Sequence, residues 1–368
     1  MQAILIEDGH AEEWDAFVKK DHSFSLMQSW AWGEVKKQLG WDAYRVAVTD
    51  AGVIVAGALM LVKQLPMGAG SLGYIPCGPV GDWTDSGVAG RLFEALHAIA
   101  RDRRAIFLKV EPCATADSSV PALLTELGFC ASSIANQPRA TIVMDIAPEP
   151  EAILRSMRDS TRRKIKSTEK KGLTVRFGTI EDLPIFYELM TLTAKRAGFP
   201  LRSYDYFVTE FGEFSKKMQA ALLLAELDGQ VLAAHISYAF GPNAAFFHQA
   251  SNTEASKLNP NCLLVWREIE WAKSEGCDTY DLWGVPDEIG ELVSAGAEPA
   301  ADRTDGLWGV YRFKSGFSKN VVAYVDSHDF VYSAVPYRLF RNRFLSQGTL
   351  ERISTRLDTA LWGSHATQ

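Results

Sequence analysis

The sequence predicts an α+β (mixed α/β) protein in which one arrangement of helices and strands occurs twice in tandem. The chain of 368 residues is too long for one ordinary core, so two domains are expected. Its hydrophobic content of 47% and charged content of 23% are those of a folded, soluble protein. The order helix, hairpin, strand, helix, strand then appears in each half, which indicates a repeat of about 150 residues.

The first half begins with helices predicted over residues 11–20 and 28–39, where apolar side chains recur at helical spacing. A hairpin follows, and its turn at Asp50-Ala51-Gly52 joins strands 44–48 and 53–62. The later elements alternate strand, helix, strand, short helix and strand, over residues 71–75, 86–102, 105–110, 121–127 and 139–145.

The second half repeats this order, beginning with a basic helix over residues 150–171. A strand at 173–176 and a helix at 181–196 lead into a hairpin that turns at Asp228-Gly229. The hairpin strands are 221–227 and 231–238, and a strand at 243–250 follows. A helix at 262–275 comes next, with Asn259-Pro260 as its start. The last elements are a strand at 279–284, a loop at 286–306 and a strand at 308–313.

The stretch Tyr311–Phe317 reads YRFKSGF and is predicted as a short aromatic strand. Neighbouring side chains of a strand point to opposite faces, so Lys314 leaves the core side that Phe313 occupies. Its ammonium then points into the space on the other face of the strand, away from the core. The alternative is an ordinary solvent-exposed strand lysine.

Composition excludes several classes of protein. The five cysteines are odd in number and never form a CxxC pair, which favours reduced thiols in a cytoplasm over a zinc ribbon. No apolar run approaches the length needed to cross a bilayer. The N-terminus carries acids where a signal peptide would carry lysines. We therefore expect a cytoplasmic location, and nothing suggests a bound metal.

Positive charge is concentrated in one segment of this acidic chain. The net charge of −7 argues against nucleic-acid binding in general, but residues 155–171 carry eight Arg and Lys against Asp159 and Glu169. Such a segment gives a local electropositive surface of the kind that a polyanion contacts. The alternative is a solvated helix face.

Six stretches, taken in order, resemble the Fem family (FemABX) of non-ribosomal peptidyltransferases across most of the chain. They are QSWAWGEVKKQLGW (28–41), LGYIPCGPV (72–80), RRKIKSTEKKGL (162–173), TAKRAGF (193–199), NCLLVWREIEWAKSEGCDTYDLWG (261–284) and YRFKSGF (311–317). The resemblance implies two tandem acyl-CoA N-acyltransferase (GNAT-like) domains, with the C-terminal segment returning to the first. We place the first, acceptor-side domain at residues 1–145 plus about 319–368, and the second, tRNA-side domain at 146–318. Some members carry a long helical arm in the second domain, and no such insertion is found here.

The resemblance also implies an activity. Members take an amino acid from aminoacyl-tRNA and join it to the stem-peptide amine of a peptidoglycan precursor, which forms an interpeptide bridge or branch. The expected partners are aminoacyl-tRNA and a muropeptide, either UDP-linked (UDP-MurNAc-pentapeptide) or lipid-linked (lipid II), and not DNA. An aminoacyl ester is already activated, so transfer requires positioning and charge stabilisation rather than ATP. No cofactor is expected beyond the aminoacyl-tRNA co-substrate.

The family has a functional Phe-Lys pair at the position of Phe313 and Lys314. We therefore predict that Lys314 stabilises charge near the tRNA 3′ end, with Phe313 packing against a terminal base or against the stem of the lysine. Glu111 and Asp281 lie at predicted strand ends and are options for a general base. The alternative is that the substrate itself moves the proton. His235 and His248 are expected to be core or hydrogen-bonded histidines.

Other cations are assigned to substrate binding. A diphosphate is bound by a guanidinium or an ammonium, and the family uses a lysine and an arginine in stretches comparable to those of Lys36 and Arg196. Arg202 is the rival of Arg196. Tyr238 is predicted to contact the same nucleotide, the alternative being a core tyrosine. The cations assigned to tRNA phosphates are Arg158, Arg162, Arg163, Lys164, Lys166 and Lys170.

Three other functions stay open. An acetyl-CoA-type N-acyltransferase needs a glycine-rich turn that opens a helix and holds the pyrophosphate, whereas this chain reads SNTEASKLNPN after Ala250. A catalytically inactive tRNA-binding protein on the same scaffold needs the basic helix alone. A third alternative is aminoacylation of a protein N-terminus or an antibiotic intermediate.

The stretch Tyr337–Leu357 mixes apolar side chains with arginines. This composition is typical of a helix that docks on its own domain. It is also typical of a peripheral contact with the inner, anionic face of a membrane, which would favour a lipid-linked acceptor.

Overall fold

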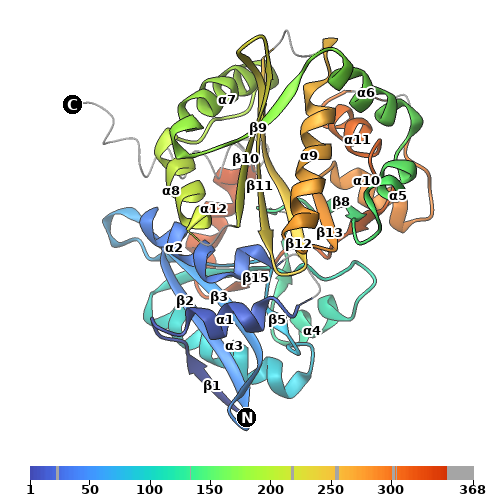
Figure 1. The fold of residues 1–368 in the computed structure, drawn as a ribbon. Helices are drawn as coiled ribbons and strands as arrows, with labels where there is room; N and C mark the ends of the chain where they lie inside the picture. The colour runs from blue at the N-terminus through green and yellow to red at the C-terminus, as the bar shows by residue number, and fades with distance from the viewer. Residues whose placement is uncertain are drawn as a thin grey trace. The chain divides into compact units, whose positions relative to one another are not determined.

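The computed structural model describes residues 1–345 apart from 22–24, 133, 217–218, 253–256, 301–302 and 304. These residues form two compact units. Unit 1 comprises Met1–Gln137 together with the chain from Tyr324 onward, and unit 2 comprises Pro138–Ala323. Each unit contains its own sheet and helices (Figure 1). The part of the predicted stretch Tyr337–Leu357 that follows residue 345 lies outside the described residues.

Unit 1 is built on a sheet with the strand order β1-β2-β3-β4-β6-β15-β7, and β5 pairs with β3. The strands are β1 (Gln2–Leu5), β2 (Asp42–Asp50), β3 (Val53–Gln64), β4 (Ser71–Pro76), β5 (Val80–Gly81), β6 (Ala105–Glu111), β7 (Cys130–Ala131) and β15 (His328–Val331). The α-helices are α1 (Ala11–Val18), α2 (Trp30–Gln38), α3 (Ser86–Asp102), α4 (Val120–Glu126) and α12 (Ala334–Leu345).

Local chemistry explains the boundaries of these elements. The β2–β3 turn needs two residues with positive φ, and Ala51 (φ 47°) and Gly52 (φ 82°) supply them. Helix α3 begins where the side chain of Asp85 accepts hydrogen bonds from two backbone N–H groups of the first turn. One face of α3 is then buried against the sheet, with Leu92 and Leu96 fully covered.

Unit 2 is built on a sheet with the strand order β14-β8-β13-β12-β11-β10-β9. The strands are β8 (Ala140–Asp145), β9 (Thr174–Gly178), β10 (Ala220–Leu227), β11 (Gln230–Phe240), β12 (Asn243–Ser251), β13 (Thr279–Gly284) and β14 (Val321–Ala323). The α-helices are α5 (Pro150–Ser156), α6 (Asp159–Lys170), α7 (Leu183–Ala197), α8 (Tyr204–Ser215), α9 (Pro260–Ser274), α10 (Asp287–Ser294) and α11 (Trp308–Lys314).

The predicted tandem repeat is confirmed by the two sheets. In unit 1 the antiparallel run β1-β2-β3-β4 leads into a parallel pair, β4 and β6, and α3 connects these two strands. In unit 2 the run β9-β10-β11-β12 leads into the parallel pair β12 and β13, connected by α9. Among the described residues of unit 2 no helix exceeds 15 residues, in agreement with the expected absence of a long arm.

Strand β8 differs from the prediction in its partners. Residues 139–145 are predicted to end the first domain, but β8 pairs with β13 and β14 in the sheet of unit 2. Its pairing partners lie far along the chain, so local pattern carries no information about which sheet it joins.

The prediction of a strand at Tyr311–Phe317 is wrong, because Trp308–Lys314 form helix α11. Trp308, Tyr311 and Ser315 recur at helical spacing, and the first and last of these are buried. Aromatic side chains favour strands in isolation. Here their packing on the core of unit 2 selects the helix instead.

Three further segments differ from the sequence prediction. The basic segment forms two helices, since Met157 and Arg158 between α5 and α6 have extended ψ angles of 158° and 139°. Helices α8 and α10 are absent from the prediction, although Ser203 caps α8 by accepting from the N–H of Tyr206. Asn259 precedes α9 in the left-handed conformation, with φ 56°, and its side chain forms no cap hydrogen bond.

Candidate functional site

The parallel strands of unit 2 separate shortly after they meet. Strand β12 pairs with β13 at three positions only, Asn243–Ala245 with Thr279–Asp281, and then continues to Ser251 without a partner on that side. Strand β13 instead bulges after Asp281 and regains its register with β8 at Gly284. Side chains near this opening are therefore not covered by a neighbouring strand.

Lys314 lies beside this opening. It is the last residue of α11, its exposed fraction is 5%, and its Nζ donates to the carbonyl oxygen of Gly284 at 2.8 Å. The ammonium also lies 5.7 Å from the ring centroid of Phe246 on β12. Burial lowers the pKa of Lys314 to about 7, and the negative charge of Asp281 opposes this shift. The amine is therefore available in both protonation states near neutral pH.

The end of β13 forms a tight turn that holds the second titratable group. Asp281 is 5% exposed and accepts hydrogen bonds from the hydroxyl of Thr141 and from the N–H of Trp283 at 2.7 Å. Burial raises the pKa of Asp281 to about 6, although these two hydrogen bonds and the charge of Lys314 oppose the rise.

Trp283 adopts φ 65° in this turn, a conformation that a bulky side chain rarely takes. Its ring lies 4.5 Å from that of Phe247 on the open part of β12. Such strain persists only where the surrounding structure enforces it, and it often accompanies a functional site.

Phe313 and the start of α6 border the same lysine. Phe313 is half-buried, and its ring lies 5.3 Å from that of Phe317. The N–H of Arg158 donates to the carbonyl of Gly316 at 2.9 Å, and its guanidinium lies 3.3 Å from the hydroxyl of Ser315. The first residue of the basic segment assigned to tRNA therefore contacts the chain directly after Lys314.

Helix α6 has one buried face and one cationic face. Its buried residues are Thr161, Ile165 and Thr168, and it packs against α9. The side chains of Arg158, Arg163, Lys164, Lys166 and Lys170 are exposed, while that of Arg162 is half-buried against Asp159. Among the described residues, Arg163, Lys166 and Lys170 form no ion pair, so their charge is available to a partner.

A buried carboxylate that the sequence analysis missed lies under the open part of β12. Glu210 of α8 is 1% exposed and accepts hydrogen bonds from Tyr206 (2.5 Å), Tyr238 (2.7 Å) and His248 (2.6 Å). Burial alone would raise the pKa of Glu210, but the charge and hydrogen bond of His248 and the two tyrosine hydroxyls lower it to about 2. The sequence signal was Ser203 with apolar residues at helical spacing after it, which mark α8.

The predicted nucleotide ligands of unit 2 already have protein partners. Tyr238 is fully buried and belongs to the core, which is the alternative that the sequence left open. Arg196 is exposed, and its guanidinium donates to the carbonyl of Ser251 at 3.0 Å. Arg202 lies 4.3 Å above the ring of Tyr206. Arg196 therefore lies near the far end of β12, and Arg202 lies near the buried Glu210 cluster.

The histidines agree with expectation. His235 is fully buried between Glu268 and Asn261, at 3.1 Å from each. His248 is hydrogen-bonded to Glu210.

Two predicted site residues belong to unit 1. Lys36 on α2 is half-buried, with its ammonium 4.4 Å from the ring centroid of Trp32. Glu111 at the end of β6 is 6% exposed and accepts hydrogen bonds from Tyr74 at 2.6 Å and from the N–H of Asn136. Burial raises the pKa of Glu111. The structure thus brings together Lys314, Asp281 and Arg158 within unit 2, and it does not place Lys36 or Glu111 relative to them.

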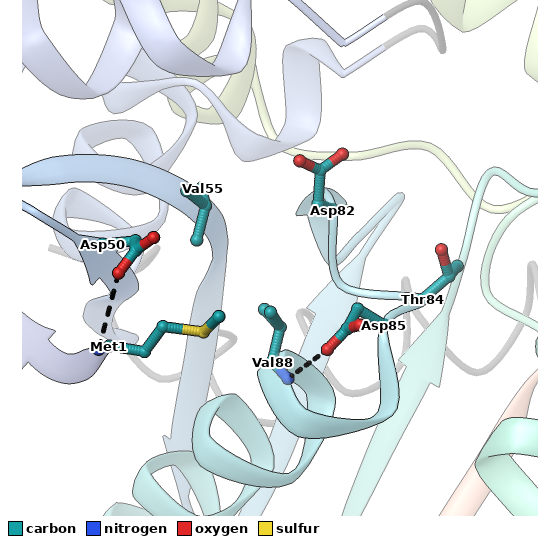
Figure 2. A pocket seen from close by; sticks show the side chains of 7 residues that line it. All are labelled: Met1, Asp50, Val55, Asp82, Thr84, Asp85 and Val88. Atoms are coloured by element: carbon teal, nitrogen blue, oxygen red, sulfur yellow. Dashed lines mark hydrogen bonds and ion pairs between the residues drawn. The ribbon is translucent and has the colours of Figure 1, made fainter.

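A pocket on unit 1 is unrelated to these residues. It is lined by Met1, Asp50, Val55, Asp82, Thr84, Asp85 and Val88 (Figure 2). Two of its carboxylates already have partners, since Asp50 pairs with the N-terminal amine and Asp85 caps α3. Across the described ranges, no group of three or more His, Cys, Asp or Glu is arranged to hold a metal ion. No helix within those same ranges is long and apolar enough to span a membrane.

Two consecutive sheets of the same strand order, each with one parallel pair after a hairpin, define a tandem N-acyltransferase (GNAT-like) fold. The crystal structure of FemX has this fold, with a TM-score of 0.82 and 23% identity, covering 93% of this chain and all of that one. The C-terminal DUF2156 domain of a putative lysylphosphatidylglycerol synthetase from Agrobacterium fabrum is more distant. Its TM-score is 0.53 at 14% identity, over 92% of this chain and 98% of that one.

The chain belongs to the FemAB family, whose model matches residues 10–120, 125–231 and 228–342. The family resemblance inferred from the six sequence stretches is thereby confirmed. A lipid II:glycine glycyltransferase of Staphylococcus aureus (strain MRSA252) is 33% identical over 226 residues, and that of Staphylococcus haemolyticus (strain JCSC1435) is 31% identical. Each match covers 59% of this chain and 54% of the relative, so the chain spans about half the length of the curated relatives it matches.

Proposed function

We propose that this protein transfers an amino acid from aminoacyl-tRNA to the stem-peptide amine of a peptidoglycan precursor. Membership of the FemAB family and relatives named as lipid II:glycine glycyltransferases support this class of reaction and favour a lipid-linked acceptor. The observation that carries the proposal is the buried amine of Lys314, next to the opening between β12 and β13.

The reaction requires one bond to form and one to break. The acceptor amine attacks the ester carbonyl carbon, and a C–N bond forms while the carbonyl oxygen becomes negative. The C–O bond to the ribose then breaks, the amine loses a proton and the ribose oxygen gains one. An ammonium has three donors, and Lys314 uses one of them on Gly284. The others can stabilise the oxyanion or protonate the leaving ribose oxygen.

Asp281 is assigned a positioning role through its charge. Its carboxylate raises the pKa of Lys314 against the effect of burial, which keeps part of the population protonated near pH 7. A buried amine without that carboxylate would be neutral and could not stabilise negative charge. Neither Glu111 nor Asp281 is required as a general base in this scheme, because the acceptor amine can lose its proton to solvent or to the substrate.

The cationic face of α6 is assigned to the tRNA phosphates. Contacts of this kind weaken steeply with salt, by a slope of about 0.7–0.9 per phosphate in a log–log plot. We expect a triple variant, with Arg163, Lys166 and Lys170 each replaced by Gln, to reduce both tRNA affinity and this slope. Replacing Lys19 and Lys20 of unit 1 by Gln is the matched control and should leave the slope unchanged. A wild-type affinity that does not depend on salt would contradict the assignment.

Lys36 and either Arg196 or Arg202 remain the proposed ligands of the acceptor diphosphate. Lys36→Ala is expected to weaken binding of UDP-MurNAc-pentapeptide, measured by calorimetry. Comparison of Arg196→Ala with Arg202→Ala decides between the two arginines. Unchanged affinity in all three variants would place the acceptor site elsewhere.

The direct test incubates the purified protein with a mixed aminoacyl-tRNA pool and either lipid II or UDP-MurNAc-pentapeptide, followed by mass spectrometry of the muropeptide. We expect a product that has gained one amino acid residue, and the mass identifies that amino acid. An acetylated product formed from acetyl-CoA would instead support an acetyl-CoA-type N-acyltransferase. Salt-dependent tRNA binding without any product would support a catalytically inactive tRNA-binding protein.

A further inference from the structure

Helix α12 of unit 1 has an inner face that packs on the sheet. The rings of Tyr337 and Phe340 lie 5.4 Å and 5.2 Å from the ring of Phe107 on β6. The hydroxyl of Tyr337 also donates to the buried carboxylate of Asp329 at 2.8 Å. This face fixes the orientation of the helix, so the opposite face points away from the sheet.

The outer face of α12 combines apolar and cationic side chains. Val335 and Leu339 are one turn apart, and each is 67% exposed. Arg338 and Arg341 on the same helix are also exposed. The part of α12 whose side chains are described, residues 334–342, contains no acidic residue. In a chain with 45 acids and 38 Arg and Lys, this segment has the opposite sign of charge.

The turn between β3 and β4 extends the same surface. Met67 in this turn has a positive φ of 57° and is completely exposed. Leu65, two residues earlier, packs against the cluster of Leu72, Ile106 and Phe107 on which α12 also rests. A methionine at a turn tip contributes nothing to the core, and its exposure leaves apolar area open to solvent.

One more arginine, Arg104, lies beside this turn. The carbonyl of Arg104 accepts the N–H of Ser71 at 3.1 Å, which places the connection between α3 and β6 next to the start of β4. Arg104 is exposed. Its neighbour Arg103 is directed to the α3 side of the sheet, because its guanidinium lies 5.4 Å from the ring of Tyr44 and 3.4 Å from Asp102, the last residue of α3.

We propose that these residues form a docking surface for an anionic lipid bilayer. We call this surface the basic–apolar face, and it consists of Met67, Val335, Leu339, Arg104, Arg338 and Arg341. Apolar side chains flanked by arginines match the interface of an anionic membrane, where the apolar groups enter the acyl boundary and the cations meet lipid phosphates. A symmetric second copy fits poorly, because it would bring the same arginines into opposition.

The test is co-sedimentation of the full chain with vesicles at physiological ionic strength. Wild type is expected to bind equimolar phosphatidylglycerol–phosphatidylcholine vesicles and to bind pure phosphatidylcholine at least tenfold more weakly. Each arginine near the bilayer contributes on the order of a fivefold change in partitioning. Arg338→Gln with Arg341→Gln should therefore reduce binding by about 10–30-fold. Raising the salt should reduce wild-type binding further.

The apolar contribution has its own matched control. The triple variant Met67→Ser, Val335→Ser and Leu339→Ser should reduce binding to the mixed vesicles at least tenfold. Val53→Ser alters a side chain of similar exposure (63%) at the β2–β3 turn of the same unit and should bind as wild type does. Replacing Lys19 and Lys20 by Gln removes two charges elsewhere on unit 1 and should have little effect. Circular dichroism verifies that every variant is folded.

Three results would overturn the proposal. The first is equal binding of wild type to neutral and anionic vesicles. The second is unchanged binding in folded variants of the basic–apolar face. The third is a concentration-dependent dimer that the Met67, Val335 and Leu339 variant abolishes, because the surface would then belong to a second copy. None of these results depends on transferase activity, so the membrane proposal can fail while the proposed function stands.

Discussion

The two parallel strand pairs occupy the same position in their sheets but differ in how far they stay together. In unit 1, β4 and β6 are paired along their whole common length, from Ser71 with Ala105 to Pro76 with Glu111. In unit 2, the pairing of β12 with β13 stops after three positions. The parallel strand pair of the repeat therefore stays together in the sheet of unit 1 and separates in the sheet of unit 2.

The side chains near the ends of these strands differ between the two units in the same way. In unit 1, Tyr74 and Glu111 at the ends of β4 and β6 bond directly to each other, which closes the gap that a ligand would need. In unit 2, Asp281 accepts hydrogen bonds from Thr141 on the neighbouring strand β8 and from Trp283 on its own strand. The amine of Lys314 donates to the carbonyl of Gly284 at the end of β13, beside the opening. The comparison fits the proposal that the transfer chemistry takes place in unit 2.

Two of the buried lysines, one in each unit, make the same contrast. Lys109 of β6 is 5% exposed at its side chain and meets Asp329 at 2.7 Å, Ser132 at 2.9 Å and the carbonyl of Ile134 at 2.7 Å. Lys314 is equally buried, but among the described residues it bonds only to a carbonyl. A buried charge with a full set of partners is typical of structure, whereas one with few partners is typical of function.

The largest expected effect is on the stability of unit 1. Lys109→Met leaves the carboxylate of Asp329 buried, with Tyr337 as its remaining donor, and removal of one partner of such a pair costs about 3–5 kcal/mol. Chemical denaturation should show this loss. The double variant Lys109→Met, Asp329→Asn no longer buries an unpaired negative charge. It should therefore recover part of the lost free energy of unfolding. A loss below about 1 kcal/mol would show that the pair is open to water.

The second-largest expected effect is on the rate of amino-acid transfer and not on the free energy of unfolding. Lys314→Met should reduce single-turnover transfer by about 10²–10³, the usual consequence of removing one group that stabilises the oxyanion. The free energy of unfolding should not fall, because burial disfavours the charged form of this lysine. Lys319→Met, which alters an exposed lysine nearby, is the control and should remain fully active. Unimpaired transfer by Lys314→Met would remove the lysine from the mechanism.

Acid unfolding tests the buried carboxylate under β12. The pKa of Glu210 falls from 4.5 to about 2 on folding, so the stabilisation is complete above pH 4.5 and is lost as pH falls toward 2. Glu210→Gln should lower the free energy of unfolding at pH 7 by on the order of 3 kcal/mol and flatten its decline in acid. Glu188→Gln on the exposed surface of α7 should retain the wild-type decline. Identical acid profiles for Glu210→Gln and wild type would contradict the assigned hydrogen bonds.

The smallest effect is a shift in the pH profile. Asp281 raises the pKa of Lys314, so Asp281→Asn should lower that pKa further. If the ammonium is the active form, transfer by Asp281→Asn declines at a correspondingly lower pH than transfer by wild type. The readout is the rate of single-turnover transfer between pH 5 and 9. Asp278→Asn, at an exposed position before β13, should leave the profile in place. A uniform loss at every pH would indicate a purely structural role for Asp281.

Much of the fold could be predicted because its signals are local. The hairpin turns need positive φ at residues such as Gly52 and Asp228, and these residue types mark the turns directly. Helix α3 was predicted with its observed bounds because Asp85 and an apolar stripe define it. The sheet to which β8 belongs could not be predicted, since its partners lie more than 130 residues away in sequence.

The candidate site was predictable only in part. Lys314 was found through its aromatic neighbours and the family resemblance, but a strand was inferred where a helix forms, because aromatic residues suit both. Glu210 was missed because two of its three donors, Tyr238 and His248, come from other elements, 28 and 38 residues further along the chain. The opening of β12 from β13 depends on strand register, which no local pattern records.

Strand β15 lies between β6 and β7 inside the sheet of unit 1, although it follows the whole of unit 2 in the sequence. A nascent chain that has emerged only to residue 323 already holds the whole of unit 2, but one edge of β6 still has no partner. Unit 2 can therefore complete its folding first, against the usual order in which N-terminal domains lead. During that interval the unpaired edge of β6 is open to aggregation, and it is the part of the new chain that most needs a chaperone.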